Sequence, residues 1–341
     1  MNRNHEVLKP HLLLDASGEL AEPGWSRSLI QKYDRGMIKA PGWRIKEWDY
    51  YLVMNDQFAG AFTISDDGYI GLQSVSLLIF GEKPWEHTET VLNAFPMGRL
   101  KMPSDSSAGV TKYRDRRLQM RFAVKNHTRH LTCHFDNFHQ GKPFSCDIRL
   151  YQPPMDSMVI ATPWRKKHAF YYNQKINCMR ASGYMVYDGV RYEFRPEDSF
   201  GTLDWGRGVW TYDNTWYWGS GNMDLDGKPF GFNIGYGFGD TSAASENVLF
   251  YDGKVHKLDD VVFHIPESGY LDPWRFTSSD GRFEMDFVPL LDRAANLDFK
   301  VLVSDQHQVF GRMSGTVILD DGTKIAVHDC MCFAEKVHNR Y

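Results

Sequence analysis

"YDGVRYEFR", residues 187–195, is the stretch that most directly indicates the fold. It places an Asp-Gly pair between two short runs in which apolar and polar residues alternate. Asp-Gly accommodates the positive φ angles of a tight two-residue turn, and flanking alternation is typical of hairpin strands. The same pattern occurs in "ILDDGTKI" at 318–325, and Asp-Gly recurs at 67–68, 226–227, 252–253 and 280–281. The chain therefore contains repeated hairpin signals.

A two-residue period also marks segments between these turns. In "RHLTCHFD" at 129–136, Leu131, Cys133 and Phe135 would share one face of a strand. Helical patterns are scarce, and only 26–33 and 86–95 favour short helices. We therefore predict an all-β fold of antiparallel strands with few short helices, arranged as meander barrels or sandwiches.

A break in this pattern predicts a domain boundary. The stretch "YQPPMDSMVIATPW" at 151–164 contains three prolines, which interrupt regular structure. We predict an N-terminal β domain over 1–155 and a C-terminal β domain over 156–341. A chain of 341 residues with 42% hydrophobic content can form the cores of two domains.

Composition excludes several classes of partner. The formal net charge is −4, which argues against binding to nucleic acid. The most apolar run, "VSLLIFG" at 75–81, is too short to span a membrane, and the first 20 residues lack signal-peptide features. Five cysteines without a CxxC pattern predict no disulfide framework. We expect a cytoplasmic protein without a membrane span.

The most unusual segment is "SFGTLDWGRGVWTYDNTWYWGSGN" at 199–222. It contains four tryptophans together with Asp204 and Arg207. One interpretation is an Asp204–Arg207 ion pair at a bend beside packed indole rings. The other is a carboxylate in a dry aromatic pocket, where burial would raise its pKa and suit it to proton transfer.

A second unusual segment is "FGFNIGYGFG" at 230–239. Alternation would place Phe230, Phe232, Ile234, Tyr236 and Phe238 on one face of a strand, and four glycines with Asn233 on the other. A row of glycines indicates close approach by a ligand or by another part of the backbone. Glu246 and Asn247 follow at the start of the next strand and would need polar partners if buried.

The sequence predicts neither a metal nor a cofactor. Histidines at 127, 130, 134 and 139 lie close together, and His130, His134 and Asp136 would share a strand face. Their spacing matches no defined zinc motif, so a solvated or paired strand face is favoured. No Walker A motif, dinucleotide fingerprint or nucleophile elbow is present.

Several separated blocks resemble the bacterial domain-of-unknown-function family 2804. They are "KEWDYYLV", "GTLDWGRGVW", "WYWGSGN", "NIGYGFGDTSAASENVLFYDGKVHKL" and "FEMDFVPLLDR". A more distant similarity is to two-domain lipocalin-like proteins, which include carotenoid hydratases, tocopherol cyclase and AttH-like proteins. That resemblance implies two lipocalin-like β domains packed together. It implies hydratase or cyclase chemistry less well, because the Asp-His-Glu-Trp-Gly block of those proteins is here Asp204-Trp205-Gly206 without the His and Glu.

Three functional hypotheses follow. The protein binds or carries a small apolar, isoprenoid or lipid-like molecule in an aromatic cavity, or it is a hydratase, isomerase or cyclase with Asp204 as acid, or it acts on carbohydrate through Asp204 and Glu246. We predict a pocket formed by the 204–218 block and the 231–247 segment. The candidate catalytic residues are Asp204 and Glu246, and the candidate ligand-binding residues are Trp205, Arg207, Trp210, Trp216, Trp218, Asn233, Tyr236 and Asn247.

Overall fold

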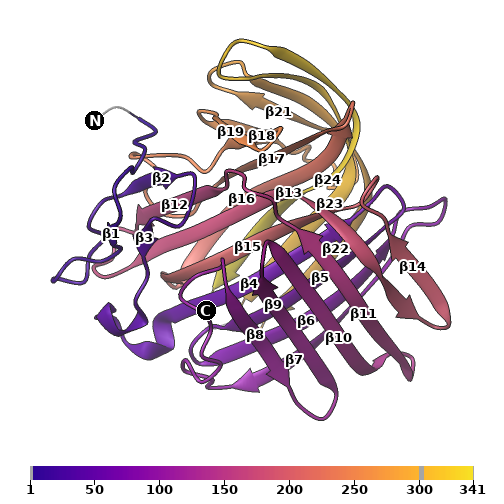
Figure 1. Ribbon diagram of the computed structural model, residues 1–341, viewed down its shortest axis with the longest axis horizontal. Helices are drawn as coiled ribbons and strands as arrows, with labels where there is room; N and C mark the ends of the chain where they lie inside the picture. The colour runs from indigo at the N-terminus through magenta and orange to yellow at the C-terminus, as the bar shows by residue number, and fades with distance from the viewer. Residues whose placement is uncertain (1–2, 299–302, 341) are drawn as a thin grey trace.

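The computed structural model describes residues 3–298 and 303–340, and this part of the chain is almost entirely β (Figure 1). The strands are β1 His11–Leu12, β2 Gly24–Ser26, β3 Gln31–Lys32, β4 Ile45–Met54, β5 Phe58–Asp66, β6 Ile70–Ile79, β7 Trp85–Ala94, β8 Gly109–Arg114, β9 Leu118–Lys125, β10 Thr128–His139, β11 Lys142–Tyr151, β12 Met158–Pro163, β13 Phe170–Tyr187, β14 Val190–Phe194, β15 Phe200–Val209, β16 Asp213–Leu225, β17 Lys228–Tyr236, β18 Val248–Tyr251, β19 Lys254–Lys257, β20 Val261–His264, β21 Trp274–Ser278, β22 Phe283–Asp298, β23 Val303–Ile318 and β24 Lys324–Arg340. Two three-residue 3-10 helices, η1 Arg35–Met37 and η2 Gly42–Arg44, precede β4.

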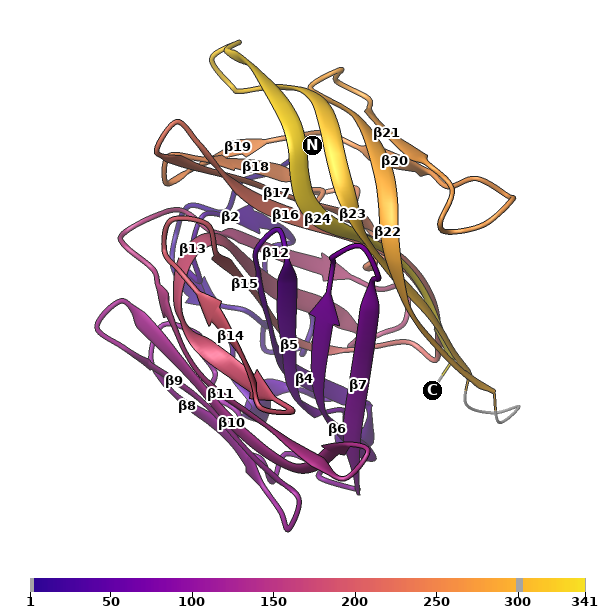
Figure 2. The ribbon, with the colours of Figure 1, turned by 90° about the vertical axis from the view of Figure 1, so that its right-hand side faces the viewer.

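Two curled antiparallel sheets contain all of these strands except β1 and β3, which pair with each other in parallel. The first follows the order β7-β6-β5-β4-β15-β13-β11-β10-β9-β8, with β12, β14 and β2 attached beside β13. The second follows β19-β18-β17-β16-β24-β23-β22-β21-β20. Figure 2 shows the second sheet arching over the first, so each sheet forms a half-barrel. The predicted all-β fold with two lipocalin-like parts is confirmed.

Three hydrophobic cores fill this arrangement. The first lies inside the curl of the first sheet and includes Phe62, Phe122 and Trp205. The third lies inside the second sheet and includes Phe232 and Trp274. Between them, the outer face of the first sheet packs against the second sheet through a middle core that is rich in aromatic side chains.

The Asp-Gly pairs lie where the sequence predicts them. All six fall in the turns that join adjacent antiparallel strands of the two sheets. In three of these turns the aspartate also has a positive φ, at Asp188, Asp226 and Asp252. This geometry is the one that a tight hairpin requires at both central residues.

Two expectations differ from the structure. Residues 86–95, considered for a short helix, lie almost entirely in strand β7, and 26–33 contain only short extended segments and loops. Strand β7 pairs with β6 along its whole length, and this pairing fixes the extended conformation although the sequence of β7 does not alternate between polar and apolar residues. The division into domains at 155/156 stays a prediction; in the structure, β12 to β15 belong to the first sheet and the chain passes to the second sheet at 210–212.

A β-bulge in β13 joins the two sheets. The pairing of β13 with β15 shifts between Ile176 and Met179, and Cys178 has a φ of 62°. The bulge turns Asn177 toward the second sheet, where its amide nitrogen donates to Ser220 Oγ at 2.8 Å and to the Phe232 carbonyl at 3.2 Å. A buried amide that is bonded to two strands of the other sheet fixes the relative position of the sheets.

Strand alternation on β15 assigns its side chains to different cores. Leu203, Trp205 and Val209 face the first core, whereas Asp204 faces the second sheet. Gly206 is opposite Trp48 in the ladder between β15 and β4. A Cβ atom on Gly206 would lie 2.0 Å from the Trp48 ring, so only glycine lets this indole lie flat across β15.

We expect Gly206→Ala to lower the free energy of unfolding by about 1–3 kcal/mol, because the added methyl group displaces a packed indole ring. Urea denaturation measures this change. Gly81→Ala is the matched control, since nothing lies within 4 Å of its Cβ position. It should alter stability by less than about 0.5 kcal/mol. Equal effects of the two substitutions would contradict this account of Gly206.

Candidate functional site

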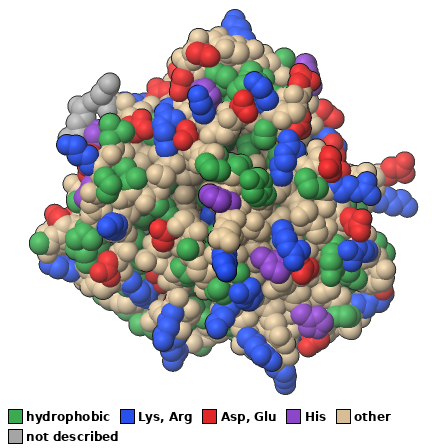
Figure 3. Space-filling view, in the orientation of Figure 1, with side chains coloured by type: hydrophobic (Ala, Val, Ile, Leu, Met, Phe, Trp, Pro, Cys, Tyr) green, Lys and Arg blue, Asp and Glu red, His purple; other side chains and the backbone are tan. Residues whose placement is uncertain are grey.

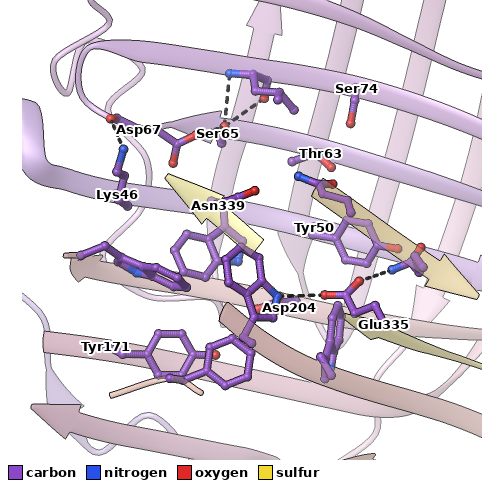
Figure 4. Close-up of a pocket in the computed structure, with 18 of the residues that line it drawn as sticks. Lys46, Tyr50, Thr63, Ser65, Asp67, Ser74, Tyr171, Asp204, Glu335 and Asn339 are labelled. Carbon is purple, nitrogen blue, oxygen red and sulfur yellow. Dashed lines mark hydrogen bonds between the residues drawn. The ribbon is translucent and has the colours of Figure 1, made fainter. Parts of the chain in front are cut away.

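A cavity of about 240 Å³ lies between the two sheets (Figure 4). We call it the inter-sheet cavity. Its lining comes from β4 to β6 and from β13 and β15 on the first sheet, and from β16 and β22 to β24 on the second. The lining residues are Lys46, Trp48, Tyr50, Thr63, Ser65, Asp67, Leu72, Ser74, Tyr171, Lys175, Asp204, Trp210, Trp216, Trp218, Phe238, Arg293, Gln306, Gln308, Glu335 and Asn339.

One part of this lining is an aromatic cluster. Its members pack edge to face or stacked with ring centroids 4.9–6.3 Å apart, which is favourable geometry for aromatic pairs. They are Trp48, Tyr171, Trp210, Trp216 and Phe238. Trp218 lies near this cluster and packs against Tyr50 and Phe333. The rings present flat apolar surface to any molecule in the cavity.

Asp204 belongs to a buried ion pair, but its partner is Lys175. Lys175 Nζ lies 2.9 Å from Asp204 Oδ2, and Asn173 donates to Oδ1 at 2.6 Å. Lys175 and Asp204 are direct cross-strand partners on β13 and β15. The ammonium also lies 3.9 Å from the centre of the Trp218 ring, where the face of the indole attracts a cation. The ion pair therefore lies in the lining of the cavity.

The predicted Asp204–Arg207 pair does not form. Residues three apart on a continuous strand point to opposite faces, so Arg207 lies on the first-core side of β15. There it is fully buried and bonds Asp49 Oδ1 at 3.0 Å and the Trp48 and Pro103 carbonyls at 2.8 Å. Its guanidinium also stacks on the Trp205 ring at 4.2 Å. Arg207 is thus held by the scaffold, away from the inter-sheet cavity.

A buried polar layer lies behind the cavity. Trp218 Nε1 donates to Asn233 Oδ1 at 2.7 Å, and Asn233 Nδ2 donates to the Glu246 carbonyl at 3.0 Å. Tyr171 donates its hydroxyl to Glu246 Oε2 at 3.4 Å. Burial raises the pKa of Glu246 from 4.5 to about 7. Glu246 therefore contacts the cavity only through residues that line it.

The glycines of β17 make room for this layer. Phe230, Phe232 and Ile234 face the third core, and Asn233 is the side chain on the glycine face, as the alternation predicts. A Cβ on Gly235 would lie 2.4 Å from Glu246 Oε1. Phe238 departs from the predicted face, because β17 ends at Tyr236 and Gly237 reverses the chain with a φ of 96°. Phe238 thereby joins the aromatic cluster.

A second carboxyl group, Glu335, lies in the cavity lining on β24. Trp216 Nε1 donates to its Oε1 at 3.1 Å and Gln308 Nε2 donates to its Oε2 at 2.8 Å. Burial raises the pKa of Glu335, although both donors oppose the rise. Tyr50 lies on the same side of the cavity (Figure 4), and burial raises its pKa to about 12, so it is a phenol at neutral pH.

At the other side of the cavity, Lys46 donates to the Asp67 carbonyl at 3.0 Å (Figure 4). Burial lowers the pKa of Lys46 to about 8 and raises the pKa of Asp67. Arg293 reaches in from β22 and donates to Ser76 Oγ at 2.9 Å. The cavity thus combines aromatic surface with charged groups at its margins.

The structure brings together only some of the predicted site residues. Asp204, Trp210, Trp216 and Trp218 line the cavity, and Asn233 and Glu246 lie directly behind it. Trp205 and Arg207 face the first core, and Tyr236 packs against the third. Asn247 is buried outside the lining, where its side chain bonds the Gly235 N–H and the Asp259 carbonyl.

Sequence reasoning missed the lining residues of other strands. Lys46, Trp48 and Tyr50 share one face of β4, and Gln308 and Glu335 come from β23 and β24. A strand over "KEWDYYLV" would place Lys46, Trp48 and Tyr50 on one face, because side chains two residues apart in a strand point the same way. The partner of Asp204, Lys175, carries no local signal, since it depends on the register of two strands about 30 residues apart.

Other predictions concern cysteines, metals and membranes. All five cysteines are buried and free, as expected without a disulfide framework. His130 pairs with Asp147 and His134 with Asp136, and within 3–298 and 303–340 no three His, Cys, Asp or Glu side chains gather as a metal site. No helix in the described part of the chain has the length and apolarity needed to cross a membrane. Figure 3 shows charges of both signs interspersed over one face.

These features define a lipocalin-like, all-β protein with an aromatic cavity between two half-barrels. The chain belongs to the family of the domain of unknown function DUF2804, whose profile matches residues 4–341. Comparison with curated proteins gave no match.

Solved structures are similar to this chain. A putative AttH from Nitrosomonas europaea is similar over 86% of this chain and 92% of that chain, with a TM-score of 0.50 and 12% sequence identity. At this identity the similarity concerns the fold alone. Kievitone hydratase from Nectria haematococca is aligned over 87% and 88% of the two chains, with a TM-score of 0.44 and 9% identity.

Removing one member of the buried ion pair should be costly. We expect Lys175→Met to lower the free energy of unfolding by about 3–5 kcal/mol, because it leaves the buried Asp204 carboxylate without its ammonium. Adding Asp204→Asn to that variant should recover part of the loss. Urea denaturation of both single variants and the double variant measures the coupling. Strictly additive losses would argue against the pair.

Glu246 should make stability depend on pH. Its folded pKa is raised to about 7, so between pH 4.5 and 7 the folded state holds more protons than the unfolded state. The free energy of unfolding should therefore fall by about 3 kcal/mol as the pH rises through this window. Urea denaturation at several pH values measures this dependence, and the free energy of unfolding of Glu246→Gln should change less with pH than that of the wild-type chain. Glu193→Gln, on exposed β14, should keep the wild-type profile.

Proposed function

We propose that the protein binds a small, ring-containing and largely apolar molecule in the inter-sheet cavity. The observation that carries this proposal is the aromatic cluster, which presents apolar faces to an unfilled space between the two half-barrels. Closely packed interiors seldom leave such volumes, so a lined cavity of this kind is characteristic of ligand sites.

The size of the cavity limits the ligand. A space of about 240 Å³ exceeds the ~150 Å³ that accommodates one benzene ring and is below the ~300 Å³ at which pockets for drug-sized molecules begin. One or two fused rings, or a short prenyl-like chain, match this volume. A long isoprenoid would have to extend beyond the lining.

The charges favour a ligand with a polar end. Lys175 is already paired with Asp204, and Lys46 and Arg293 are hydrogen-bonded to neighbouring groups of the protein. An entirely apolar ligand would leave these groups without water and without new partners. A polar substituent on the ligand avoids part of that cost.

Calorimetry with 2-naphthol, a fused-ring molecule of this size with one polar substituent, tests the proposal. We expect saturable binding of one molecule per chain, and we expect Ser74→Phe to weaken it at least tenfold, because Ser74 is a half-buried lining residue and a phenyl ring would occupy the cavity. Gln119→Phe adds the same ring at an exposed position on β9 and should bind as the wild type does. Absence of binding to the wild-type chain, or equal binding by Ser74→Phe, would contradict the proposal.

An enzymatic role for the same cavity is a second candidate. The supporting observation is Glu335, a buried carboxyl group in the lining whose raised pKa favours the protonated form of a general acid. It suits that role better than Asp204, because Asp204 lies 2.9 Å from the Lys175 ammonium, whereas the two groups that donate to Glu335 are neutral. Glu246 does not reach the lining, so the Asp204 and Glu246 pair required by a carbohydrate-active enzyme finds no support.

Native mass spectrometry of protein purified from its source organism separates carrier from enzyme. A bound molecule can be extracted, identified and incubated with fresh protein. An enzyme should convert it, and Glu335→Gln should retain binding while losing at least a hundredfold in rate. A carrier should leave the molecule chemically unchanged, whether the wild-type chain or Glu335→Gln is used.

A further inference from the structure

Among the described residues that line the cavity, three have a buried side-chain polar atom without a hydrogen-bond partner, namely the Tyr50 hydroxyl, Gln308 Oε1 and Trp210 Nε1. The first two belong to side chains that interact with each other and are only 8% and 3% exposed. The Gln308 side chain lies close enough to the Tyr50 hydroxyl to oppose the rise in its pKa, but the contact between them falls outside hydrogen-bond distance and angle. A buried polar atom without a partner costs roughly 1–3 kcal/mol of stability in other proteins. The fold alone gives no reason to keep this pair.

Their chemistry is complementary. Burial keeps Tyr50 a phenol at neutral pH, so it has a proton to donate. Gln308 has its Nε2 bonded to Glu335 Oε2, which leaves its Oε1 as an acceptor. One atom offers a donor and the other an acceptor, from β4 of the first sheet and β23 of the second. A hydroxyl group is the simple substituent that accepts one hydrogen bond and donates another at the same oxygen.

We propose that the molecule bound in the inter-sheet cavity carries a hydroxyl group, which accepts from the Tyr50 hydroxyl and donates to Gln308 Oε1. This inference rests on the proposed binding function and adds the chemical class of its ligand, a hydroxylated ring compound such as a phenol or a cyclic alcohol. Figure 4 shows the position of Tyr50 beside Glu335, at the side of the cavity away from Lys46 and Asp67. The ring of the ligand would then lie against the aromatic cluster.

Glu335 positions the acceptor. Its carboxyl group holds the Gln308 amide nitrogen at 2.8 Å and is itself held by Trp216 Nε1 at 3.1 Å. Because Trp216 belongs to the aromatic cluster, the same indole lines the apolar region and orients the polar end. The polar and apolar requirements on the ligand are therefore set by connected side chains.

Two probes of matched shape test this inference. 2-Naphthol and 2-methylnaphthalene differ only by a hydroxyl in place of a methyl group. We expect the wild-type chain to bind 2-naphthol about three- to tenfold more tightly, as one or two neutral hydrogen bonds would provide. Tyr50→Phe removes the donor and keeps the ring, so this preference should fall to about twofold or less.

Control variants and stability complete the experiment. Tyr184→Phe removes a hydroxyl from β13 outside the cavity lining and should keep the wild-type preference. Tyr50→Phe should be at least as stable as the wild type, because it removes a buried hydroxyl that has no partner. A destabilised Tyr50→Phe chain would show that this hydroxyl serves the fold, which would overturn the inference.

The outcomes distinguish the inference from the proposed function. Equal affinities of the two probes for the wild-type chain, or a preference that survives in Tyr50→Phe, would overturn the hydroxyl assignment while leaving cavity binding in place. Failure of both probes to bind would instead reject the cavity proposal itself. A preference for 2-naphthol that Tyr50→Phe abolishes and Tyr184→Phe preserves would support both.

Discussion

The buried contact between Lys175 and Asp204 is the constraint on which the arrangement of the two sheets depends. Two opposite charges on the outer face of the first sheet cannot be covered by an ordinary apolar surface without a large desolvation cost. The second sheet covers them with Trp218, whose ring face attracts the ammonium, and Asn173 satisfies the carboxylate from the first sheet. The composition of the middle core follows from this requirement.

The cavity follows from the same geometry. The two curled sheets contact each other at the β13 bulge, where Asn177 bonds strands of the second sheet, and also where Phe80 packs against Phe310 and Arg293 bonds Ser76. The inter-sheet cavity lies in a region where the two sheets do not close on each other. Rigid rings such as Trp48 and Trp210 pack against one another across this region and keep it from collapsing, with Gly206 providing the space for Trp48. The cavity is therefore a product of sheet curvature and stiff side chains.

Local patterns predicted much of the fold and less of the site. The Asp-Gly turns and the two faces of β17 depend on neighbouring residues, so the sequence indicates them directly. The alternation in β15 could equally have excluded an Asp204–Arg207 pair, because residues three apart face opposite ways. The partner Lys175 depends on strand register, and Glu335 reaches the cavity from β24, more than 100 residues further along. Such non-local contacts leave no local signal.

The topology of the second sheet has a consequence for how the protein is made. Its first strand, β16, pairs with β24, so that Asp213 lies opposite Arg340. During synthesis from the N-terminus, β16 can pair with β17 early, but its ladder with β24 cannot form until β24 has left the ribosome. The first half-barrel can fold early, but its charged and aromatic outer face stays uncovered until then. Nascent chains should therefore depend on chaperones until β24 has been synthesised and can pair with β16.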